Sequence, residues 1–338
     1  MTPGTRHQGR RMIKNDPLRV GIIGTGKHGS RYANHIVKDL GHCFQLAAIS
    51  RRSAAAKEQA AAWNTRLFAD WRELVSSPLV DAVICVTTPN LNPEIARFCA
   101  AQNKPLLLEK PLTTDFHTAK ELVALFERKS LPLTIGQTLR YNSVICALRD
   151  MLPSMGRVFS LGASQRLEPS TLSWLEQPEI AGAGVIFHTA VHLFDALRFI
   201  TGQEIVRIRA TARNIYNPRL EDVVTAEVLM ADGALGTIDT SKVSPSRACR
   251  YEFVCEKGQL HGDQVHGLLQ KIVGMDISHL PVPPPGPAIL PLLEDWYAYL
   301  QGDIDNPIPG AEGLAAVKIC HACRKSVATD QWVTIDEL

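Results

Sequence analysis

The sequence predicts two units: an α/β unit with a doubly wound parallel sheet, then an α+β unit with an open, mostly antiparallel sheet. The chain's 338 residues exceed the usual size of one domain. In the first half, short apolar runs alternate with helical patterns, as in a parallel sheet covered by helices on both faces. In the second half, longer runs with partial alternation indicate an antiparallel sheet. We therefore expect the first unit at 17–137 and the second at 138–338, after a basic, polar and disordered lead-in at 1–16.

The individual elements follow from these patterns. In the first unit, strands are predicted at 18–23, 46–49, 81–86, 105–109 and 133–136, and helices at 30–40, 53–62, 93–102 and 115–128. In the second unit, helices are predicted at 181–200, 290–300 and 311–326, and strands at 205–213, 223–230, 234–240 and 251–256. Asp232-Gly233, between two of these strands, is a hairpin signal.

Composition limits the classes of partner. Apolar residues make up 45%, charged residues 21% and the formal net charge is +2, which is ordinary for a globular protein and offers no nucleic-acid footprint. No apolar run approaches the length of a membrane span, and the basic first sixteen residues lack the apolar core of a secretory signal. A basic arm for nucleic acid is the alternative interpretation of that segment. We expect a cytoplasmic protein that binds neither nucleic acid nor membrane.

Eight cysteines are scattered along the chain, several of them inside apolar runs. Without a secretory signal, free buried thiols are expected rather than disulfides. Cys320 and Cys323 have CxxC spacing, but there is no second pair and no strand–helix context of the thioredoxin kind. No redox site and no metal site is predicted there.

Six residues after the first predicted strand carry a phosphate-binding pattern. They are Gly24, Thr25, Gly26, Lys27, His28 and Gly29, with the spacing GxGxxG. The first glycine makes the tight turn, the second lets the backbone approach a pyrophosphate, and the third lets the helix pack on the strand. The N–H groups at the helix N-terminus then face the phosphates. Between a strand and a helix, this pattern predicts a dinucleotide-binding Rossmann unit.

The end of the second strand bears on the choice of dinucleotide. Sites that prefer NAD place an acid here to hold the ribose hydroxyls. This chain instead has Ser50, Arg51 and Arg52. Guanidinium groups pair well with phosphate oxygens, so the residues favour the 2′-phosphate of NADP over NAD. A solvated strand end is the alternative interpretation.

Several further motifs occur in order along the chain. Glu109-Lys110-Pro111 follows one predicted strand, Thr87-Thr88-Pro89-Asn90 follows the strand before it, and Arg140-Tyr141 follows the last strand of the first unit. A glycine-rich segment at 182–195 opens the next helix. Together they resemble the glucose–fructose oxidoreductase / inositol dehydrogenase / rhizopine-catabolism (Gfo/Idh/MocA) family, over nearly the whole chain.

The resemblance implies roles for particular residues. Lys110 matches the lysine beside the nicotinamide and the reacting hydroxyl, and His192 matches the family's catalytic histidine. His188 stands where many relatives have aspartate, so the site is more cationic and an anionic or strongly polar substrate, such as a sugar acid, is our hypothesis. His188 is expected to contact the substrate or to share a proton with His192. Two histidines at this spacing also resemble a zinc pair, but no third ligand is apparent, and no metal is predicted.

The same resemblance assigns the remaining contacts. Expected cofactor contacts beyond the glycine turn and the second strand are Thr87, Thr88, Pro89, Asn90, Glu109, Lys110 and Gln137. Expected substrate contacts are Arg140, Tyr141, His188 and His192. For Arg140 an interdomain salt bridge is the alternative interpretation. A second departure from the family is Pro93, where relatives often have histidine.

The resemblance implies an NAD(P)-dependent oxidoreductase that transfers a hydride between nicotinamide and a secondary alcohol or ketone of a sugar, cyclitol or sugar-acid derivative. Two alternatives stay open: a non-catalytic regulatory protein that senses NAD(P), and a glycosidase with tightly held NAD. The open sheet in this family usually packs on a partner subunit, so a homodimer or homotetramer is expected.

Overall fold

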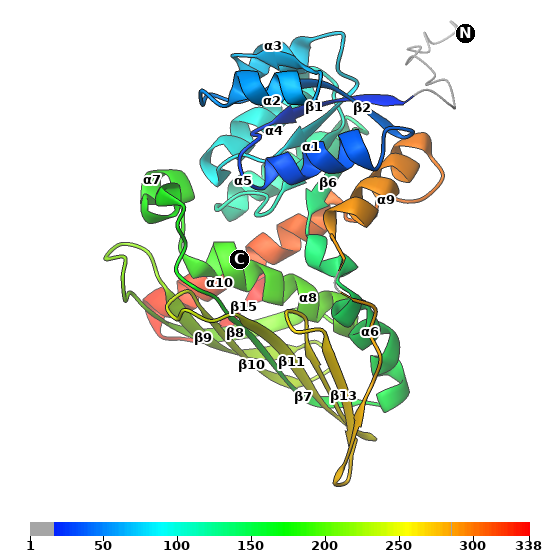
Figure 1. Ribbon diagram of the computed structural model, residues 1–338. Coiled ribbons are helices and arrows are strands. Elements are labelled where there is room, and N and C mark those ends of the chain that lie inside the picture. Colours follow the sequence, from blue (N-terminus) through cyan, green and yellow to red (C-terminus); the bar gives the residue numbers. More distant parts are fainter. Residues whose placement is uncertain (1–16, 285) are drawn as a thin grey trace, which may run out of the picture.

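The computed structural model describes residues 17–284 and 286–338, so the expected lead-in at 1–16 lies outside the described residues. Two units are stacked, with a parallel sheet in the first and a large mixed sheet in the second (Figure 1). All pairs of the six-stranded first sheet are parallel, in the order β3-β2-β1-β4-β5-β6. The doubly wound α/β prediction is confirmed. The strand order reverses between β1 and β4, and ligands bind such sheets at the carboxyl ends of the strands near this reversal.

The elements of the first unit lie close to their predicted ranges. The strands are β1 (Leu18–Ile23), β2 (Phe44–Ser50), β3 (Arg66–Phe68), β4 (Ala82–Cys85), β5 (Leu106–Glu109) and β6 (Leu133–Gly136). The helices are α1 (Gly29–Lys38), α2 (Ala56–Ala62), α3 (Trp71–Ser76), α4 (Asn92–Ala101) and α5 (Phe116–Arg128). The sequence patterns did not predict β3 and α3. Both are short, and β3 is a partly exposed edge strand, so neither has an apolar run of detectable length.

The second sheet has nine strands in the order β14-β13-β12-β11-β7-β10-β9-β8-β15. They are β7 (Val158–Arg166), β8 (Ile205–Arg213), β9 (Val223–Met230), β10 (Leu235–Ser241), β11 (Ala248–Cys255), β12 (Gly258–Asp263), β13 (Leu268–Val273), β14 (Asp276–His279) and β15 (Val333–Thr334). Only the β7–β10 pair is parallel, so the mostly antiparallel prediction is confirmed. The sequence patterns did not predict five of these strands, namely β7, β12, β13, β14 and β15. In β7, the buried positions include a glutamine, Gln165, which interrupts the apolar alternation.

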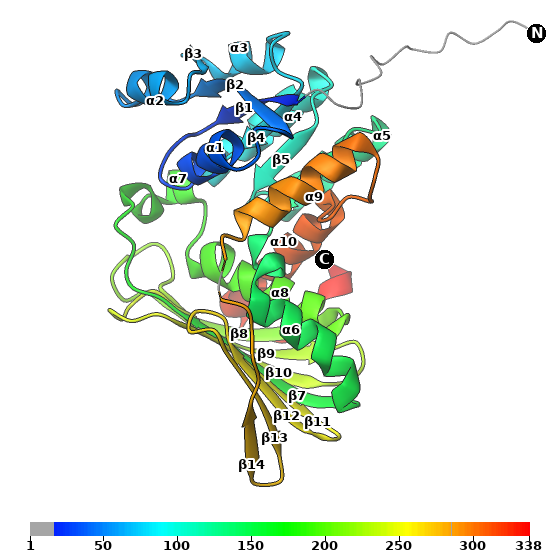
Figure 2. The same ribbon diagram turned by 45° about the vertical axis from the view of Figure 1, so that its right-hand side comes forward.

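Helices cover the face of the second sheet that looks toward the first unit (Figure 1). They are α6 (Ser143–Met151), α8 (Val191–Thr201) and α10 (Gly310–Thr329), which contact β12, β7 and β8 respectively. Helix α9 (Ile289–Gln301) runs instead along the first unit beside α1 (Figure 2). The second unit therefore supplies the helices that cover its own sheet and also a helix, α9, that packs against the first unit.

The single helix predicted at 181–200 was wrong. A short helix α7 (Pro178–Ala181) ends at Gly182, whose backbone is left-handed with φ of 72°, and a π-helical turn at Ile186–Ala190 then leads into α8. The expectation that no apolar run approaches a membrane span also needs correction, because the helical run Pro178–Thr201 is long and apolar enough. Of its most apolar window, 78% is buried inside the protein. The apolar side chains of this segment therefore pack in the core of the protein.

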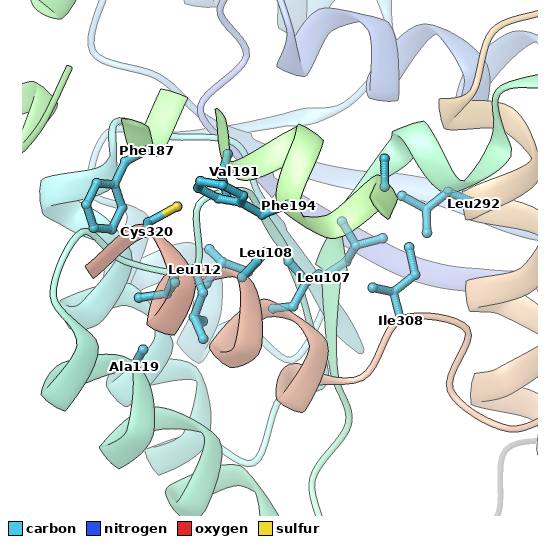
Figure 3. Close-up of a cluster of buried hydrophobic side chains, with 14 of the residues drawn as sticks. Leu107, Leu108, Leu112, Ala119, Phe187, Val191, Phe194, Leu292, Ile308 and Cys320 are labelled. Carbon is cyan, nitrogen blue, oxygen red and sulfur yellow. The ribbon is translucent and has the colours of Figure 1, made fainter. Parts of the chain in front are cut away.

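A shared core joins the two units (Figure 3). Leu107, Leu108 and Leu112 of the first unit lie near Phe187, Val191 and Phe194 of the second, and Cys320 of α10 lies beside them. All are buried. The strand β6 is also joined to the last part of the chain, since the Ile135 amide donates to the Ile308 carbonyl at 2.9 Å. The two units are therefore packed together as well as connected by the chain.

Candidate active site

The glycine turn between β1 and α1 has the geometry that its spacing predicts. Gly24 has φ of +91°, and a Cβ there would lie 2.3 Å from the Val86 carbonyl oxygen. A Cβ on Gly29 would lie 2.0 Å from the Gly24 carbonyl oxygen, so helix and turn are in close contact. A Cβ on Gly26 would meet nothing within 4 Å. No side chain caps α1. The open space at Gly26 and the uncapped helix N-terminus fit a dinucleotide pyrophosphate.

The three residues at the end of β2 differ in their surroundings. Ser50 is buried and Arg52 is exposed. Arg51 reaches the glycine turn, where its Nη1 donates to the Thr25 carbonyl at 2.8 Å. A guanidinium is thus held next to the phosphate-binding turn, on the strand end where the ribose of a bound dinucleotide lies. This position suits a 2′-phosphate.

Glu109, at the end of β5, is a buried carboxylate with partners from the glycine turn and α1. Its Oε1 accepts from the Tyr32 hydroxyl at 2.5 Å and lies 2.8 Å from His28 Nε2. Burial alone would raise the pKa of Glu109, but these hydrogen bonds and the His28 charge leave it lowered. Glu109 therefore holds the glycine turn and α1 against the end of β5, which Lys110 follows. Its carboxylate already accepts from Tyr32 and lies beside His28.

Lys110 follows directly and points between the two units. Its Nζ donates to the His188 backbone carbonyl at 3.2 Å. Burial lowers the pKa of Lys110, opposed by the nearby Glu109. A lysine at this place can donate a hydrogen bond to a substrate oxygen or take part in proton transfer. The structure thus brings Lys110 to the π-helical turn that carries His188.

His188 and His192 lie on either side of the start of α8. His188 is buried, its Nε2 lies 3.1 Å from the Ala181 carbonyl, and its ring makes an edge contact with Trp174. Burial and the charges of Lys242 and Lys110 lower the pKa of His188 to about 3. Among the described residues no hydrogen bond joins the two imidazoles. The Ala181 contact thus turns the His188 ring toward the protein backbone, so a proton shared directly with His192 is not what this geometry favours.

His192 is the less enclosed of the two. Its ring has no hydrogen-bond partner within 17–284 and 286–338, so both nitrogens are open to a ligand. Burial, then the charges of Lys110 and Lys242, lowers the pKa of His192 well below its usual range. A neutral imidazole beside Lys110 can accept the proton of a hydroxyl.

Lys242, just after β10, is a site residue that the sequence patterns missed. Burial and the neighbouring Lys110 charge lower the pKa of Lys242 to about 8. It affects the pKa of both His188 and His192, which places it in the same cluster. Nothing in the local sequence marks it, because it joins the cluster through tertiary contacts: its amide donates to the Asp222 carbonyl, and β10 contacts the π-helical turn that carries His188.

The loop after β4 and the residue after β6 complete the carboxyl edge of the first sheet. The Thr87 and Thr88 hydroxyls contact Asn92 and Asn90 side chains, and Pro89 is buried. Gln137 is 2% exposed, and no partner for its Oε1 appears among the described residues. An unpartnered buried amide oxygen at a strand's carboxyl end is consistent with a nucleotide contact, because such groups are otherwise costly.

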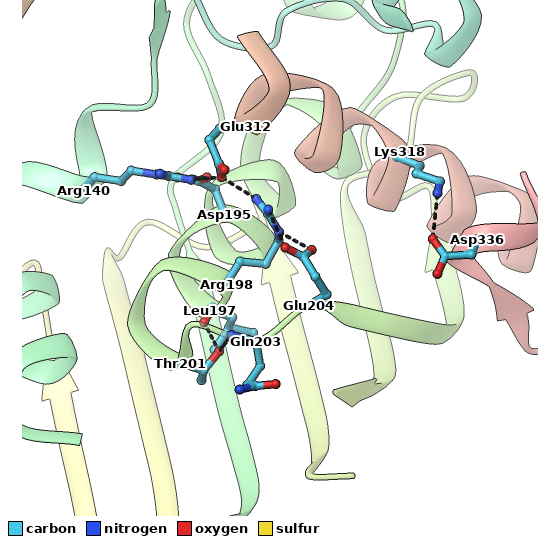
Figure 4. A network of polar contacts seen from close by, with 10 residues as sticks. All are labelled: Arg140, Asp195, Leu197, Arg198, Thr201, Gln203, Glu204, Glu312, Lys318 and Asp336. Atoms are coloured by element: carbon cyan, nitrogen blue, oxygen red, sulfur yellow. Dashed lines mark hydrogen bonds and ion pairs between the residues drawn. The ribbon is translucent and has the colours of Figure 1, made fainter. Parts of the chain in front are cut away.

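The structure places Arg140 and Tyr141 in protein contacts (Figure 4). The Arg140 guanidinium bonds Asp195 of α8 at 2.6 Å and Glu312 of α10 at 2.5 Å, and Glu312 also pairs with Arg198 at 2.8 Å. The Tyr141 hydroxyl donates to Asp295 of α9 at 2.7 Å. These geometries favour the ion-pair interpretation of Arg140 over a substrate clamp, and they occupy the Tyr141 hydroxyl. The sequence motif contained Asp195 but did not identify it as Arg140's partner.

Metal and thiol chemistry find no support in the part of the chain that the structure describes. No three His, Cys, Asp or Glu side chains gather there in a metal-binding arrangement. All eight cysteines are free thiols. Cys320 and Cys323 are buried in α10, and burial raises the pKa of both. Buried, protonated thiols are poor nucleophiles.

The first unit carries a Rossmann phosphate turn and Lys110, and the second, sheet-based unit brings His188 and His192 to Lys110. This combination defines the class: a dinucleotide-dependent oxidoreductase. Residues 18–137 match the oxidoreductase family with an NAD-binding Rossmann fold, and residues 154–261 match the Gfo/Idh/MocA C-terminal domain. The chain belongs to the Gfo/Idh/MocA family and is an NAD(P)-dependent enzyme of the dehydrogenase/reductase type acting on CH–OH groups.

Comparisons with individual proteins agree with this assignment. A myo-inositol dehydrogenase of Streptomyces leeuwenhoekii is 28% identical over 253 residues, covering 72% of this chain and 76% of the relative. An oxidoreductase domain protein from Kribbella flavida superposes with a TM-score of 0.86 at 22% identity, covering 94% of this chain and 99% of the other. A levoglucosan dehydrogenase in complex with NADH superposes with a TM-score of 0.84 at 21% identity, covering 95% of this chain and 99% of the other. At these identities the two structures establish the fold alone.

Proposed function

We propose that this enzyme transfers a hydride between NAD(P), with NADP favoured, and a secondary alcohol or ketone of a sugar, cyclitol or sugar-acid derivative. One observation carries the proposal: Lys110 of the first unit and the π-helical turn before His192 of the second meet at the carboxyl edge of the Rossmann sheet. The names of the inositol and levoglucosan dehydrogenases support a sugar or cyclitol substrate.

The proposed roles follow from the state of each side chain. A bound nicotinamide would accept or supply the hydride. His192, held neutral by burial and by the Lys110 and Lys242 charges, would take the hydroxyl proton during oxidation and return it during reduction. Lys110 would donate a hydrogen bond to the reacting oxygen, from an amine already oriented by the His188 carbonyl. His188 would contribute that carbonyl and a wall of the substrate pocket.

The nucleotide preference is tested by fluorescence titration of NADPH and NADH against the wild type and Arg51→Asp. The matched control is Arg128→Asp, an exposed arginine at the far end of α5. We expect tighter binding of NADPH by the wild type and the control, and loss of that preference in Arg51→Asp. Equal binding, or a preference for NADH, would refute the phosphate role of Arg51.

The reaction is tested by absorbance at the nicotinamide band with a panel of sugars, cyclitols and sugar acids. Turnover that disappears in Lys110→Met and His192→Asn is expected. Nucleotide binding without turnover of any alcohol or ketone would favour the regulatory alternative. A nucleotide retained through purification, with glycoside cleavage and no net redox change, would favour the glycosidase.

We also propose that the enzyme is a cytoplasmic homodimer or homotetramer. The face of the second sheet turned away from the helices is open (Figure 1). Leu235 and Val254 are exposed and lie on this face, opposite Ser160 on either side of β7. Apolar side chains on an open sheet face are commonly covered by another subunit. Light scattering at several concentrations tests this, and a monomer at micromolar concentration would contradict it.

A further inference from the structure

We propose that Lys242 and the cavity that it lines bind an anionic group of the substrate, the carboxylate of a sugar acid, while the reacting carbinol lies between Lys110 and His192. The inference rests on the proposed function and deepens it by naming the substrate class. It is carried by a cavity and an unpaired cation that the sequence motifs do not include.

The cavity lies between the segment after β7 and the loop before β9. Its volume is about 370 Å³, within the roughly 300–1,000 Å³ of ordinary small-molecule sites. Its lining includes His188, Lys242, Gly184, Tyr216 and Asn217. His188 belongs to both places: it is one of the residues that line the cavity, and its carbonyl accepts from Lys110 Nζ. A ligand that fills the cavity therefore lies next to the proposed catalytic residues.

Lys242 has no ion pair among the residues that the structure describes, although it is largely removed from water. Its own amide is fixed by the Asp222 carbonyl at 3.0 Å, so the backbone position is determined. The nearest charges from other elements are Lys110 and Asp222. A desolvated cation without a partner is costly, and an anion that enters the cavity relieves this cost.

The acidic groups around the cavity are engaged elsewhere. Asp222 Oδ2 accepts from the amides of Ile215, Tyr216 and Asn217 at 2.8–3.1 Å. Glu221 Oε1 accepts from the Ile186 amide at 3.1 Å, and burial raises the pKa of its carboxyl group.

The two other charged groups in the cavity lining lie toward solvent. Arg219 pairs with Glu179 at 2.8 Å, so its charge is already balanced. Glu176 is exposed. Among these groups Lys242 is therefore the enclosed charge without an ion pair, and Asp222 acts on it electrostatically without forming a salt bridge in the described part of the chain.

The basic side chains near Lys242 also support binding of an anion. His188 and Lys242 line the cavity, and the charges of Lys110 and Lys242 act on both His188 and His192. No carboxylate of the described residues makes an ion pair with either lysine. A neutral polyol would leave the Lys242 charge without a counterion. A carboxylate supplies that counterion and forms charge-assisted hydrogen bonds with an ammonium group.

The test compares hexuronates with their parent hexoses, which differ at one carbon. Glucuronate and glucose, galacturonate and galactose, and mannuronate and mannose are titrated against enzyme saturated with NADPH, with the nucleotide fluorescence as readout. The proteins are the wild type, Lys242→Met, the charge-conserving Lys242→Arg and, as matched control, Lys120→Met on the exposed face of α5. Turnover of the same six sugars with NADP+ and NAD+ is measured separately.

We expect at least one uronate to bind more tightly than its hexose by about tenfold or more, the lower end of what a charged hydrogen bond contributes. Lys242→Met should remove that difference, Lys242→Arg should keep part of it, and Lys120→Met should keep all of it. NADPH affinity should be the same in all four proteins, which excludes a folding defect.

Other outcomes separate this inference from the proposed function. No uronate preference in the wild type, or a preference that survives in Lys242→Met, overturns the subsite, whatever the turnover shows. Uronate binding that depends on Lys242 without any redox turnover keeps the subsite and overturns the proposed reaction. Turnover of neutral hexoses with uronates excluded keeps the reaction and overturns the subsite.

Discussion

Two groups of basic side chains lie around α8, and their surroundings are opposite. Arg140 and Arg198 are ion-paired with Asp195, Glu204 and Glu312. Lys110 and Lys242, together with two neutral histidines, have no such partners in the described part of the chain. Where charge fixes the structure it is balanced within the protein, and where a ligand is expected it is left unbalanced. The four predictions below test this contrast, from the largest expected effect to the smallest.

Replacing Lys110 with methionine should reduce turnover with the best substrate by about 10²–10⁴-fold, the usual range for a proton-transfer or hydrogen-bonding group. Because Lys110 makes no ion pair in the described part of the chain and loses only its hydrogen bond to the His188 carbonyl, the free energy of unfolding should fall by no more than about 1.5 kcal/mol. Steady-state kinetics and urea denaturation measure the two quantities, with Lys120→Met as control. A loss of rate below tenfold would remove Lys110 from the reaction.

For the ion-paired arginines, Arg140 and Arg198, the loss of a partner should lower the free energy of unfolding. Asp195→Ala leaves the buried Arg140 guanidinium without its main partner and should lower the free energy of unfolding by about 3 kcal/mol or more. Glu204→Ala removes a carboxylate that is 59% exposed and should cost under about 1 kcal/mol. Urea denaturation of both variants provides the comparison. Equal losses would contradict the assignment of Arg140 to a structural network.

The buried His188 should make the protein sensitive to acid. Its pKa is lowered to about 3 in the folded state, against 6.5 ordinarily, so the unfolded state binds more protons between these values. The stability that depends on neutral His188 is therefore complete above pH 6.5 and is lost as pH falls toward 3, at up to about 1.4 kcal/mol per pH unit. In His188→Gln this slope should be shallower. Denaturation curves between pH 7 and 4.5 measure it, and identical slopes would show that His188 ionises freely in the folded protein.

The smallest effect concerns Lys242. Because its charge is desolvated and unpaired, Lys242→Met should leave the stability unchanged or raise the free energy of unfolding by about 1 kcal/mol. Thermal and urea denaturation beside Lys120→Met would detect the difference. A clear loss of stability in Lys242→Met would show that the lysine has a structural partner and that the contrast between the two groups fails.

The sequence predicted those parts of the fold and site that depend on local patterns. The strand β4 is apolar throughout and β1 and β5 each contain a single charged residue, and the glycine spacing at 24–29 requires one kind of turn, so the strands and the turn were predictable. The break at Gly182 was not, because an apolar run of this length also fits an uninterrupted helix. The domain boundary at 137 stays a prediction, and α9 and α10 lie against the first unit although they follow that boundary.

The missed site residues have a different cause. Lys242 reaches the cluster through the contact of its amide with Asp222 and of β10 with the π-helical turn, and Asp195 meets Arg140 across 55 residues of sequence. Neither relation leaves a periodic or spacing signal in a single sequence. Motifs predicted the residues of the glycine turn and of the strand ends, whereas tertiary pairing brings Lys242 and Asp195 to their neighbours.

The contact between β6 and the end of the chain has a consequence for how the protein is made. Gly310 and Gly313 of α10 pack against Leu133 and Ile135, and the Ile135 amide donates to the Ile308 carbonyl. During synthesis the first sheet therefore precedes the segment 308–313 that packs against its edge strand β6. A nascent chain that has reached only β6 has an edge strand without these contacts.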